Sequence, residues 1–235
     1  MAHPVIAAIT TLLDEAHIID QTITNLYNQG VDRIYANIGP CTDNTKDVVA
    51  QWPEVTTVYD DSPIHYQPDM MNMLAHQAAA DGATWIVPFD ADEFWHGESH
   101  PTIAASLNAL PDTVGTIWVG QYHYHTREYR NPNINGLNKV AYRYHPTASL
   151  GNGNHYVTGV PGDAAYGILL IRELQYSSYD HFRKKIADRC RTIDPLMEAR
   201  GDGDHHLRYR DVSEEVLVEA WAALAATATV LDPIP

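Results

Sequence analysis

The sequence predicts an α/β protein whose mostly parallel central sheet is flanked by helices. Short β-rich runs alternate with segments of helical periodicity over residues 4–90, and this alternation is typical of parallel sheets. A chain of 235 residues with 45% hydrophobic content can bury one sizeable core. The fourth apolar run ends in a group of carboxylates, which predicts a ligand site at the edge of that sheet.

The first two strands and the helix between them follow from local signals. PVIAAIT favours a strand, and RIYANI is the second such run. Between them, one helical face carries Ile19, Ile23, Leu26 and Tyr27, and Gly30 supplies a natural stop. We therefore expect a β-α-β unit over this part of the chain.

The next two units repeat the alternation. In the turn-rich loop GPCTDNT, Thr42 or Asp43 can cap a helix that continues through Val49, and TTVY is the third strand. Pro68 stands where a third helix begins, and apolar residues follow it at helical spacing. TWIVPF is the fourth strand and completes the series.

The charge balance and the cysteines narrow the function classes. Lys and Arg number 15 against 30 Asp and Glu, a net charge of -15, which disfavours a protein that coats duplex nucleic acid. Cys41 and Cys190 lack metal-type spacing, so we expect reduced thiols in a cytoplasmic protein. The most apolar late segment, residues 216–231, is shorter than the roughly 20 residues of a membrane span, and none is expected.

The segment WIVPFDADEFW places two aspartates where the fourth strand ends. In an extended chain residues i and i+2 point the same way, so Asp90 and Asp92 are expected to reach one site. Two converging carboxylates repel each other unless a cation or protons lie between them, and Mg²⁺ binds through one or two carboxylates plus substrate phosphates. The pattern therefore predicts a metal and phosphate site.

The Asp-x-Asp pattern alone is weak, because it arises by chance in a chain rich in aspartate. Asp202 and Asp204 form a second pair in RGDGDHH, where a solvated turn is the better interpretation. The position of Asp90 and Asp92 after a buried strand favours metal binding, with helix capping or surface charge as the alternative.

Several stretches together resemble the GT-A glycosyltransferases, specifically the glycosyltransferase family 2 type. They are ITTLLDEAHIIDQTITNLYNQGVDRIYANIGPCTDNT and HYQPDMMNMLAHQAAADGATWIVPFDADEFW; the later pieces KVAYR, GNGNHYV and IRELQYSSYDHFRKKI are similar to a bacterial and phage subgroup. The resemblance covers about residues 4–190. It implies a Rossmann-like GT-A domain over 1–210, with a nucleotide-sugar-binding half over 1–98 and an acceptor-side half over 99–210, followed by a terminal helix and tail over 211–235.

What the resemblance implies is sugar transfer from a nucleoside-diphosphate sugar, a UDP-sugar first, to an acceptor hydroxyl with Mn²⁺ or Mg²⁺. Asp92 would bind the metal directly, and Asp90 would bind the ribose or the metal through water. His155, in a Gly-rich loop, would be a third metal ligand, against the alternative of a solvent-facing imidazole. The chain departs from the family pattern at Ile38, where an acidic residue is usual, and at Ser177, where an arginine is common.

Further donor contacts are expected from strand ends and helix starts. The expected donor-binding positions are Thr11, Leu12, Glu15, Asp43, Gln67, Asn72, Asp90, Ala91, Lys139 and Arg143. For the residues near Glu15 the alternative is a capped helix start, and for Gln67 and Asn72 it is ordinary helix-start polarity. Lys139 and Arg143 lie four apart on one strand face and could hold a pyrophosphate, or form ion pairs on a solvated face.

The general base is expected at a carboxylate close to the ligand edge. Glu173 ends the apolar strand GILLIRE and is the first candidate, with Asp163 and Asp180 as fallbacks. An inverting reaction needs such a base, whereas a retaining one could proceed without it, so the stereochemistry stays open.

The acceptor side is expected where aromatic residues gather. WVGQYHYHTREYRNPN and the loop near Tyr176 could stack against a carbohydrate or another hydroxyl acceptor, and the alternative is a strand with exposed tyrosines. A modified DNA base is one conceivable acceptor, although the net charge argues against it. The terminal helix, with Asp211 or Ser213 as its cap, would pack its Ala-rich face on the core or on a second subunit, so a homodimer is a further expectation.

Two rival classes remain open. A catalytically silent nucleotide-sugar-binding module would keep the same sheet and the same carboxylates. A metal-dependent nucleotidyltransferase or hydrolase would also place carboxylates beside phosphates, but TTLLDEA has no Gly-rich phosphate loop with a lysine after the first strand.

Overall fold

The computed structural model describes residues 3–62, 67–192 and 208–234. The chain forms two compact units. The first unit comprises Met1–Gln121 and Asn135–Glu173, and the second comprises Tyr122–Ile134 and Leu174–Pro235. The expected boundary at residue 210 therefore differs from the observed division, because the terminal helix shares an apolar core with the helix that begins at Tyr179.

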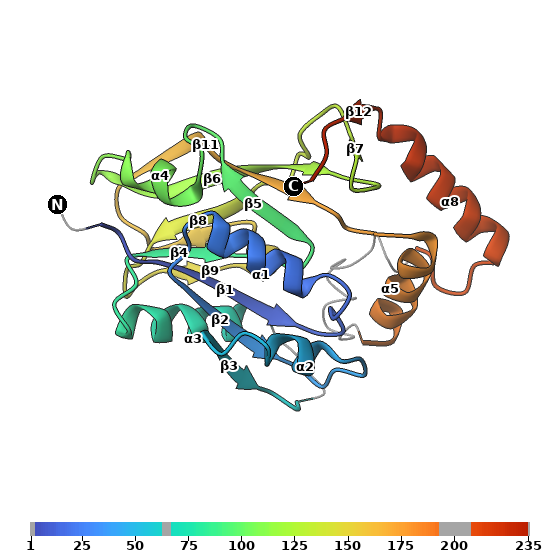
Figure 1. The fold of residues 1–235 in the computed structure, drawn as a ribbon, viewed down its shortest axis with the longest axis horizontal. Helices are drawn as coiled ribbons and strands as arrows, with labels where there is room; N and C mark the ends of the chain where they lie inside the picture. The colour runs from blue at the N-terminus through green and yellow to red at the C-terminus, as the bar shows by residue number, and fades with distance from the viewer. Residues whose placement is uncertain (1–2, 63–66, 193–207, 235) are drawn as a thin grey trace. The chain divides into compact units, whose positions relative to one another are not determined.

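The first half of the first unit is the predicted β/α series (Figure 1). Its elements are β1 (Ile6–Leu12), α1 (Ile19–Asn28), β2 (Arg33–Ile38), α2 (Thr45–Val49), β3 (Val55–Tyr59), α3 (Gln67–Ala80) and β4 (Trp85–Pro88). The strands lie parallel in the order β3-β2-β1-β4. The α/β class is confirmed, as are the four strands and three helices expected in this region.

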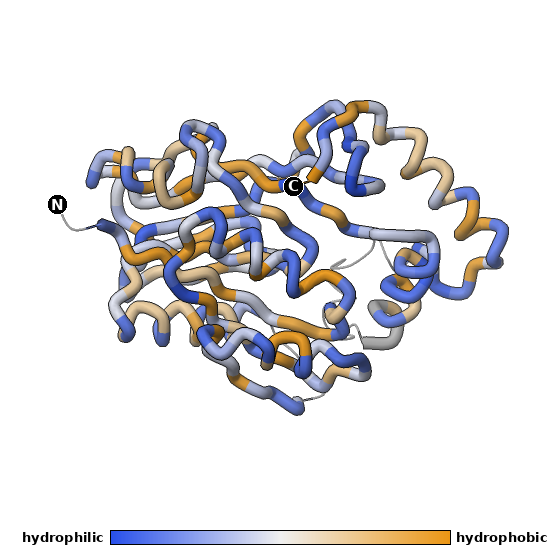
Figure 2. The backbone as a smooth tube through the Cα atoms, in the orientation of Figure 1, coloured by the Kyte–Doolittle hydropathy of each residue, from blue (hydrophilic) through white to orange (hydrophobic). Residues whose placement is uncertain are grey.

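The two faces of this parallel half are covered by different helices. Parallel crossovers are right-handed, so the reversal of direction after β3 places α3 on the opposite face from α1 and α2. On the α3 side, Ala7, Ile9 and Tyr35 of the strands pack with Met71 and Leu74 of the helix in one buried core. Figure 2 shows the hydrophobic stretches that run along β1.

The second half of the sheet is antiparallel where its pairings are described. Its elements are β5 (Glu93–Gly97), α4 (Ile103–Asn108), β6 (Val114–His123), β8 (Lys139–Arg143) and β11 (Asp163–Glu173). β8 pairs antiparallel with both β4 and β6, and β11 pairs antiparallel with β5. The sheet is therefore mixed, with its parallel part confined to the first four strands. The expectation of a mostly parallel sheet holds only for that part.

The strand order requires the sheet to curl. The eight strands follow the order β3-β2-β1-β4-β8-β6-β11-β5, so β5 lies four positions from β4. In a flat sheet that separation would be roughly 19 Å, yet only residues 89–92 connect the two strands, and they include a tight turn. Curling brings the end of β4 and the start of β5 together, and α1 packs against β5.

A small hairpin and a short helix complete the first unit. β9 (Ser149–Leu150) pairs antiparallel with β10 (Val157–Thr158), and the 3-10 helix η1 (Asn152–Asn154) lies between them. Asn72 of α3 anchors this hairpin, because its side chain accepts a hydrogen bond from Leu150 N at 2.8 Å and donates one to Leu150 O at 3.2 Å.

The second unit is built around two helices. Its elements are β7 (Tyr129–Arg130), α5 (Tyr179–Thr192), α8 (Glu214–Thr227) and β12 (Val230–Leu231), and β7 pairs antiparallel with β12. Phe182 of α5 lies with its ring centroid 5.7 Å from that of Trp221 of α8. Ser213, one of the two expected cap residues, has the N-cap position of α8, although its side chain makes no capping hydrogen bond. Figure 2 shows hydrophobic residues along most of this helix. None of the described helices combines the length and hydrophobicity that a bilayer span requires.

Gly30 is predicted to be essential for the close packing after α1. It has a φ of +81°, and a Cβ at this position would lie 2.6 Å from Ala104 Cβ. Gly30→Ala combines a left-handed backbone with overpacking and should reduce the free energy of unfolding by about 2–4 kcal/mol, as measured by urea denaturation. Gly82→Ala is the matched control, since Gly82 has a φ of +98° but a Cβ added there would meet no atom within 4 Å. Equal losses in both variants would contradict the packing argument.

Candidate functional site

The candidate site lies where the strand order reverses. β2 and β3 extend the sheet on one side of β1, and β4 lies on its other side. In open α/β sheets, ligands bind beyond the carboxyl ends of the strands at such a switch point. Here those ends are Leu12 of β1 and Pro88 of β4.

The residues that follow β4 form a tight turn. Glu93 N donates a hydrogen bond to Asp90 O at 3.1 Å, and Ala91 and Asp92 occupy the turn between them. The expectation that Asp90 and Asp92 share one side of an extended chain is therefore wrong, because the chain has to turn here to begin β5. Asp92 is buried, whereas the side chain of Asp90 is 37% exposed. Ala91 is anchored through its carbonyl, which accepts a hydrogen bond from the Thr22 hydroxyl.

Lys139 forms ion pairs with two carboxylates of this turn. Its Nζ lies 2.5 Å from Asp90 Oδ2 and 2.9 Å from Glu93 Oε1, and its side chain is only 6% exposed. β8 begins at Lys139 and runs antiparallel to β4, which brings the start of β8 to the carboxyl end of β4. The ammonium ion that was expected to hold a pyrophosphate is thus enclosed by carboxylates.

Glu173 joins the same group of charges. It ends β11 and pairs in register with Glu93, the first residue of β5. Its carboxylate acts electrostatically on both Lys139 and Glu93. The curled sheet thus assembles a charge cluster of Asp90, Glu93, Lys139 and Glu173 from the carboxyl ends of β4 and β11 and the starts of β5 and β8.

The cluster contains one ammonium ion and three carboxylates, and this imbalance shifts their ionisation. Burial raises the pKa of Glu93 to about 8; the positive charge of Lys139 opposes the rise, and the negative charges of Asp90 and Glu173 add to it. Burial alone would lower the pKa of Lys139, but the three carboxylates outweigh it and raise that pKa above its ordinary value. The ammonium ion therefore stays charged, while Glu93 holds a proton near neutral pH.

This ionisation predicts a pH dependence of stability. Because the raised pKa lets the folded protein keep a proton that the unfolded chain loses, the contribution of Glu93 to stability should fall between pH 4.5 and about 8. The slope should approach about 1.4 kcal/mol per pH unit. Urea unfolding across this range should show the slope in the wild type and a reduced slope in Glu93→Gln. Parallel curves for the two proteins would show that Glu93 ionises normally.

A loop on the other side of Asp90 is tied to the same carboxylate. Asn154 Nδ2 donates to Asp90 Oδ1 at 3.3 Å, and Gln67 Nε2 lies 3.5 Å from the same oxygen. Gln67 Oε1 accepts from Gly153 N at 3.0 Å, so the start of α3 and the loop are joined. The sequence interpretation missed Asn154, although an Asn next to Gly in a tight loop is a signal for the positive φ of 60° that it adopts.

His155 is oriented by a backbone carbonyl. Its Nδ1 lies 2.9 Å from Asn138 O, and because a carbonyl only accepts, the proton is on Nδ1 and the lone pair is on Nε2. A Cβ added to Gly153 would lie 2.8 Å from His155 Nε2, so the glycine leaves room at that nitrogen. Metal-binding histidines commonly have this second hydrogen bond.

The three expected metal ligands do not form a closed group. Among the described residues, one set of three His, Cys, Asp or Glu side chains has ligand atoms that all lie within 4.8 Å of one another. That set is Asp14, Cys41 and Asp43. A metal held by Asp90, Asp92 and His155 would therefore need side-chain movement or further ligands from the substrate, as Mg²⁺ sites commonly have.

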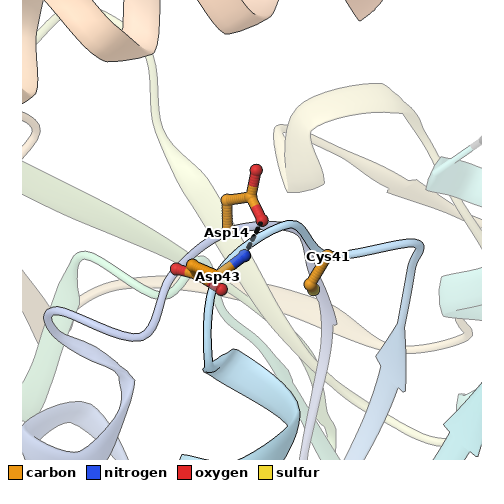
Figure 3. Close-up of side chains that lie close together, drawn as sticks. All are labelled: Asp14, Cys41 and Asp43. Carbon is orange, nitrogen blue, oxygen red and sulfur yellow. Dashed lines mark hydrogen bonds between the residues drawn. The ribbon is translucent and has the colours of Figure 1, made fainter.

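The carboxylates of Asp14 and Asp43 clamp two loops together (Figure 3). Asp14 Oδ1 accepts from Thr42 N at 2.5 Å and from Asp43 N at 3.1 Å, which links the loop after β1 to the loop after β2. Asp43 Oδ1 accepts from Thr45 N at 2.9 Å, although the N-cap residue of α2 is Asn44 rather than the expected Thr42 or Asp43. These bonds shape the loops at the switch point.

The remaining expected donor-binding positions lie at the end of β1 and in the loop that follows it. Leu12 is buried and its carbonyl accepts from Gly39 N at 2.9 Å, while Thr11 and Glu15 are half-buried. Glu15 N donates to Thr45 Oγ1 at 2.8 Å. Thr11 pairs with the buried Asn37 of β2 in the parallel ladder.

Within the first unit, the structure does not bring Arg143 and Asp163 to this place. Arg143 pairs in register with Trp85 at the start of β4 and donates to Val114 O at 2.8 Å, at the opposite end of β8 from Lys139. Asp163 begins β11, which places it roughly 33 Å of strand away from Glu173. Asp180 is an exposed residue of α5 in the second unit. Asp202 and Asp204 lie outside the described residues.

The second unit contains a small hollow. It is lined mainly by His123, Tyr124, His125, Gln175 and Tyr176, which come from the two aromatic segments expected on the acceptor side. Burial lowers the pKa of His125, whose ring centroid lies 4.1 Å from that of Trp221. The imidazole of His125 is therefore neutral near pH 7.

Comparison with known proteins gives matches to solved structures only. No protein-family profile matches the chain, and no curated protein matches it. A mycobacterial protein matches with 18% identity and a TM-score of 0.37, covering 51% of this chain and 42% of that one. Glucosyl-3-phosphoglycerate synthase from Mycobacterium tuberculosis, crystallised with Mn²⁺, UDP and phosphoglyceric acid, matches with 14% identity and a TM-score of 0.37, covering 50% and 43%. The same synthase crystallised with Mg²⁺ and UDP matches with 15% identity and a TM-score of 0.37, covering 50% of this chain and 44% of that one. The chain spans less than half the length of these matched chains.

Proposed function

We propose that the protein is a metal-dependent glycosyltransferase of the GT-A type, which transfers a sugar from a nucleoside-diphosphate sugar to an acceptor hydroxyl. The observation that carries the proposal is the placement of Asp90 and Asp92 after β4, at the switch point beside the end of β1. A UDP-sugar is the first donor to test. The bacterial and phage subgroup of family 2 remains the proposed affiliation.

The donor atoms around Asp90 suit Mn²⁺ or Mg²⁺. The half-exposed carboxylate of Asp90, the carboxylate of Asp92 and Nε2 of His155 are the groups that would hold the ion. Carboxylate oxygens suit both ions, and imidazole suits Mn²⁺ better than Mg²⁺. When bound, the metal would neutralise charge on the diphosphate leaving group.

The chain's own residues would orient the donor and the acceptor. Asn154 and Lys139 hold the two oxygens of Asp90 from opposite sides, so the carboxylate is oriented before any ligand arrives. The loops joined by Asp14 and Asp43 would border the nucleotide at the ends of β1 and β2. Preorganised groups of this kind stabilise a developing charge without having to rearrange during the reaction.

Glu173 is the proposed general base. Its carboxylate lies in the charge cluster at the end of β11, and it would take the proton from the acceptor hydroxyl as that oxygen attacks the sugar. The acceptor would be a carbohydrate or another hydroxyl compound.

The decisive experiment measures which product forms from which donor. The protein is incubated with Mn²⁺ and a panel of nucleotide sugars, with and without simple glycoside acceptors, and the nucleotides are separated by chromatography. Release of a nucleoside diphosphate supports the glycosyltransferase. Nucleotide binding by calorimetry without turnover indicates a binding module, and release of a monophosphate or pyrophosphate indicates the hydrolase or nucleotidyltransferase class. Mn²⁺-independent binding, or no binding of any nucleotide, would overturn the proposal.

A further inference from the structure

Lys139 holds one of the two oxygens of Asp90, the proposed metal ligand. Its Nζ is 2.5 Å from Asp90 Oδ2, which is the short end of a charge-assisted hydrogen bond. The other oxygen, Oδ1, accepts the weaker amide contacts from Asn154 and Gln67 at 3.3 and 3.5 Å. The most strongly held oxygen of the predicted metal ligand is therefore already bound to a cation that belongs to the chain.

Lys139 cannot contact the donor from this position. Its side chain is 6% exposed, and its ammonium group lies between Asp90 and Glu93, with Glu173 close enough to act on it electrostatically. Arg143, the cation with which it was expected to hold a pyrophosphate, lies at the other end of β8. Lys139 therefore acts through Asp90 rather than on a phosphate.

We propose that Lys139 is a resident counter-cation that competes with the divalent metal for Asp90, and so sets how tightly the metal binds. The proposal rests on the proposed function, because it concerns the same metal site. On metal binding, the ammonium ion would release Asp90 Oδ2 and keep Glu93, its second partner at 2.9 Å. Lys139 would thus keep its contact with Glu93, and the negative charge of Glu173 would remain close to the ammonium ion.

The competition follows from charge and geometry. A divalent ion bound to Asp90 would lie within a few ångströms of an ammonium ion that touches the same carboxylate. Like charges at that distance repel strongly, and the buried setting of the ammonium ion screens this repulsion less than water would. Removing the ammonium charge should therefore tighten metal binding at least about tenfold. If Lys139 only stabilised the fold, its removal would leave metal affinity unchanged or weaken it by disordering Asp90.

The test compares metal affinity in two variants that differ only at the position of the ammonium ion. Glu93→Gln/Lys139→Met lacks both the ammonium ion and the buried carboxyl group that is its second partner. Glu93→Gln alone keeps the ammonium ion and is the direct control. Mn²⁺ binding to the full chain is measured without nucleotide, by the electron paramagnetic resonance signal of free Mn²⁺. Glu93→Gln/Lys139→Gln repeats the test with an amide that can still donate to Asp90, should the methionine variant fail to fold.

The expected result is at least about tenfold tighter Mn²⁺ binding in the folded double variant than in Glu93→Gln. The gain should disappear when Asp90→Asn is added, because the competition takes place at that carboxylate. Equal or weaker affinity in the double variant overturns the inference. If the wild type shows Mn²⁺-dependent sugar transfer in that case, the proposed function survives alone. If no variant binds Mn²⁺ and the wild type shows no metal-dependent nucleotide binding, both proposals fail.

Discussion

Asp90→Asn is expected to lower the rate of sugar transfer and the Mn²⁺-dependent affinity for the nucleoside diphosphate by at least about 100-fold. Changes to residues that merely support a metal ligand cost roughly 10–100-fold, so loss of a ligand should cost more. The amide keeps the size of the side chain and can still contact Asn154, but it removes the negative charge that attracts the metal. Product release by chromatography and nucleotide titration by calorimetry, each with and without Mn²⁺, measure the effect.

The control for this variant is an aspartate outside the site. Asp112 is highly exposed and lies 3.8 Å from Arg143, at the opposite end of β8 from Lys139, so Asp112→Asn should leave transfer and affinity unchanged. Asp92→Asn should behave like Asp90→Asn if the buried aspartate is also a ligand. Unchanged nucleotide affinity and unchanged manganese dependence in the Asp90/Asp92 double variant would remove the basis of the proposed function.

Lys139→Met alone is expected to reduce the free energy of unfolding by about 3–5 kcal/mol, because breaking a buried ion pair leaves its partners uncompensated. The side chain of Glu93 is completely buried, and Asp90 and Glu173 add further negative charge around it. Since Glu93 already holds a proton near neutral pH, the loss should be smaller at about pH 6 than at about pH 9. Urea denaturation at both pH values measures it.

A surface ion pair provides the comparison for Lys139. Lys46 lies 3.6 Å from Asp61, whose side chain is 83% exposed, and such pairs contribute about 0–1 kcal/mol. Lys46→Met should therefore cost far less than Lys139→Met, and the Glu93→Gln/Lys139→Met variant should recover part of the loss. A Lys139→Met protein within about 1 kcal/mol of the wild type would show that the carboxylates do not depend on this ammonium ion.

The elements of the parallel half could be predicted from the sequence, since their signals are local. RIYANI forms β2 over Arg33–Ile38, and Gly30 follows the helix α1 with the left-handed φ expected of a C-terminal stop. The positions of Thr11 and Asp90 after apolar runs likewise predicted that both would lie at one edge of the sheet. The periodicity of hydrophobic residues is sufficient for these conclusions because each depends on neighbours within a few residues.

The composition of the charge cluster could not be predicted, because it depends on strand order. Lys139 and Arg143 share one face of β8, but they are four residues apart, roughly 13 Å along a strand, and only Lys139 reaches Asp90. The sequence places Glu93 among the carboxylates of the motif but indicates no role for it. Its burial follows from the pairing of β5 with β11, which the sequence does not signal.

The sequence by itself determined the β/α alternation, the strand that carries Asp90 and the placement of that aspartate at a carboxyl end, because hydrophobic spacing and turn chemistry act over short distances. Only the tertiary structure decided that the chain turns sharply after Asp90, that the sheet curls, and that Lys139 becomes the cation beside Asp90 and Glu93. The physical reason is that the neutralisation of a buried carboxylate depends on which distant strand ends meet it, and this is fixed by non-local pairing between strands.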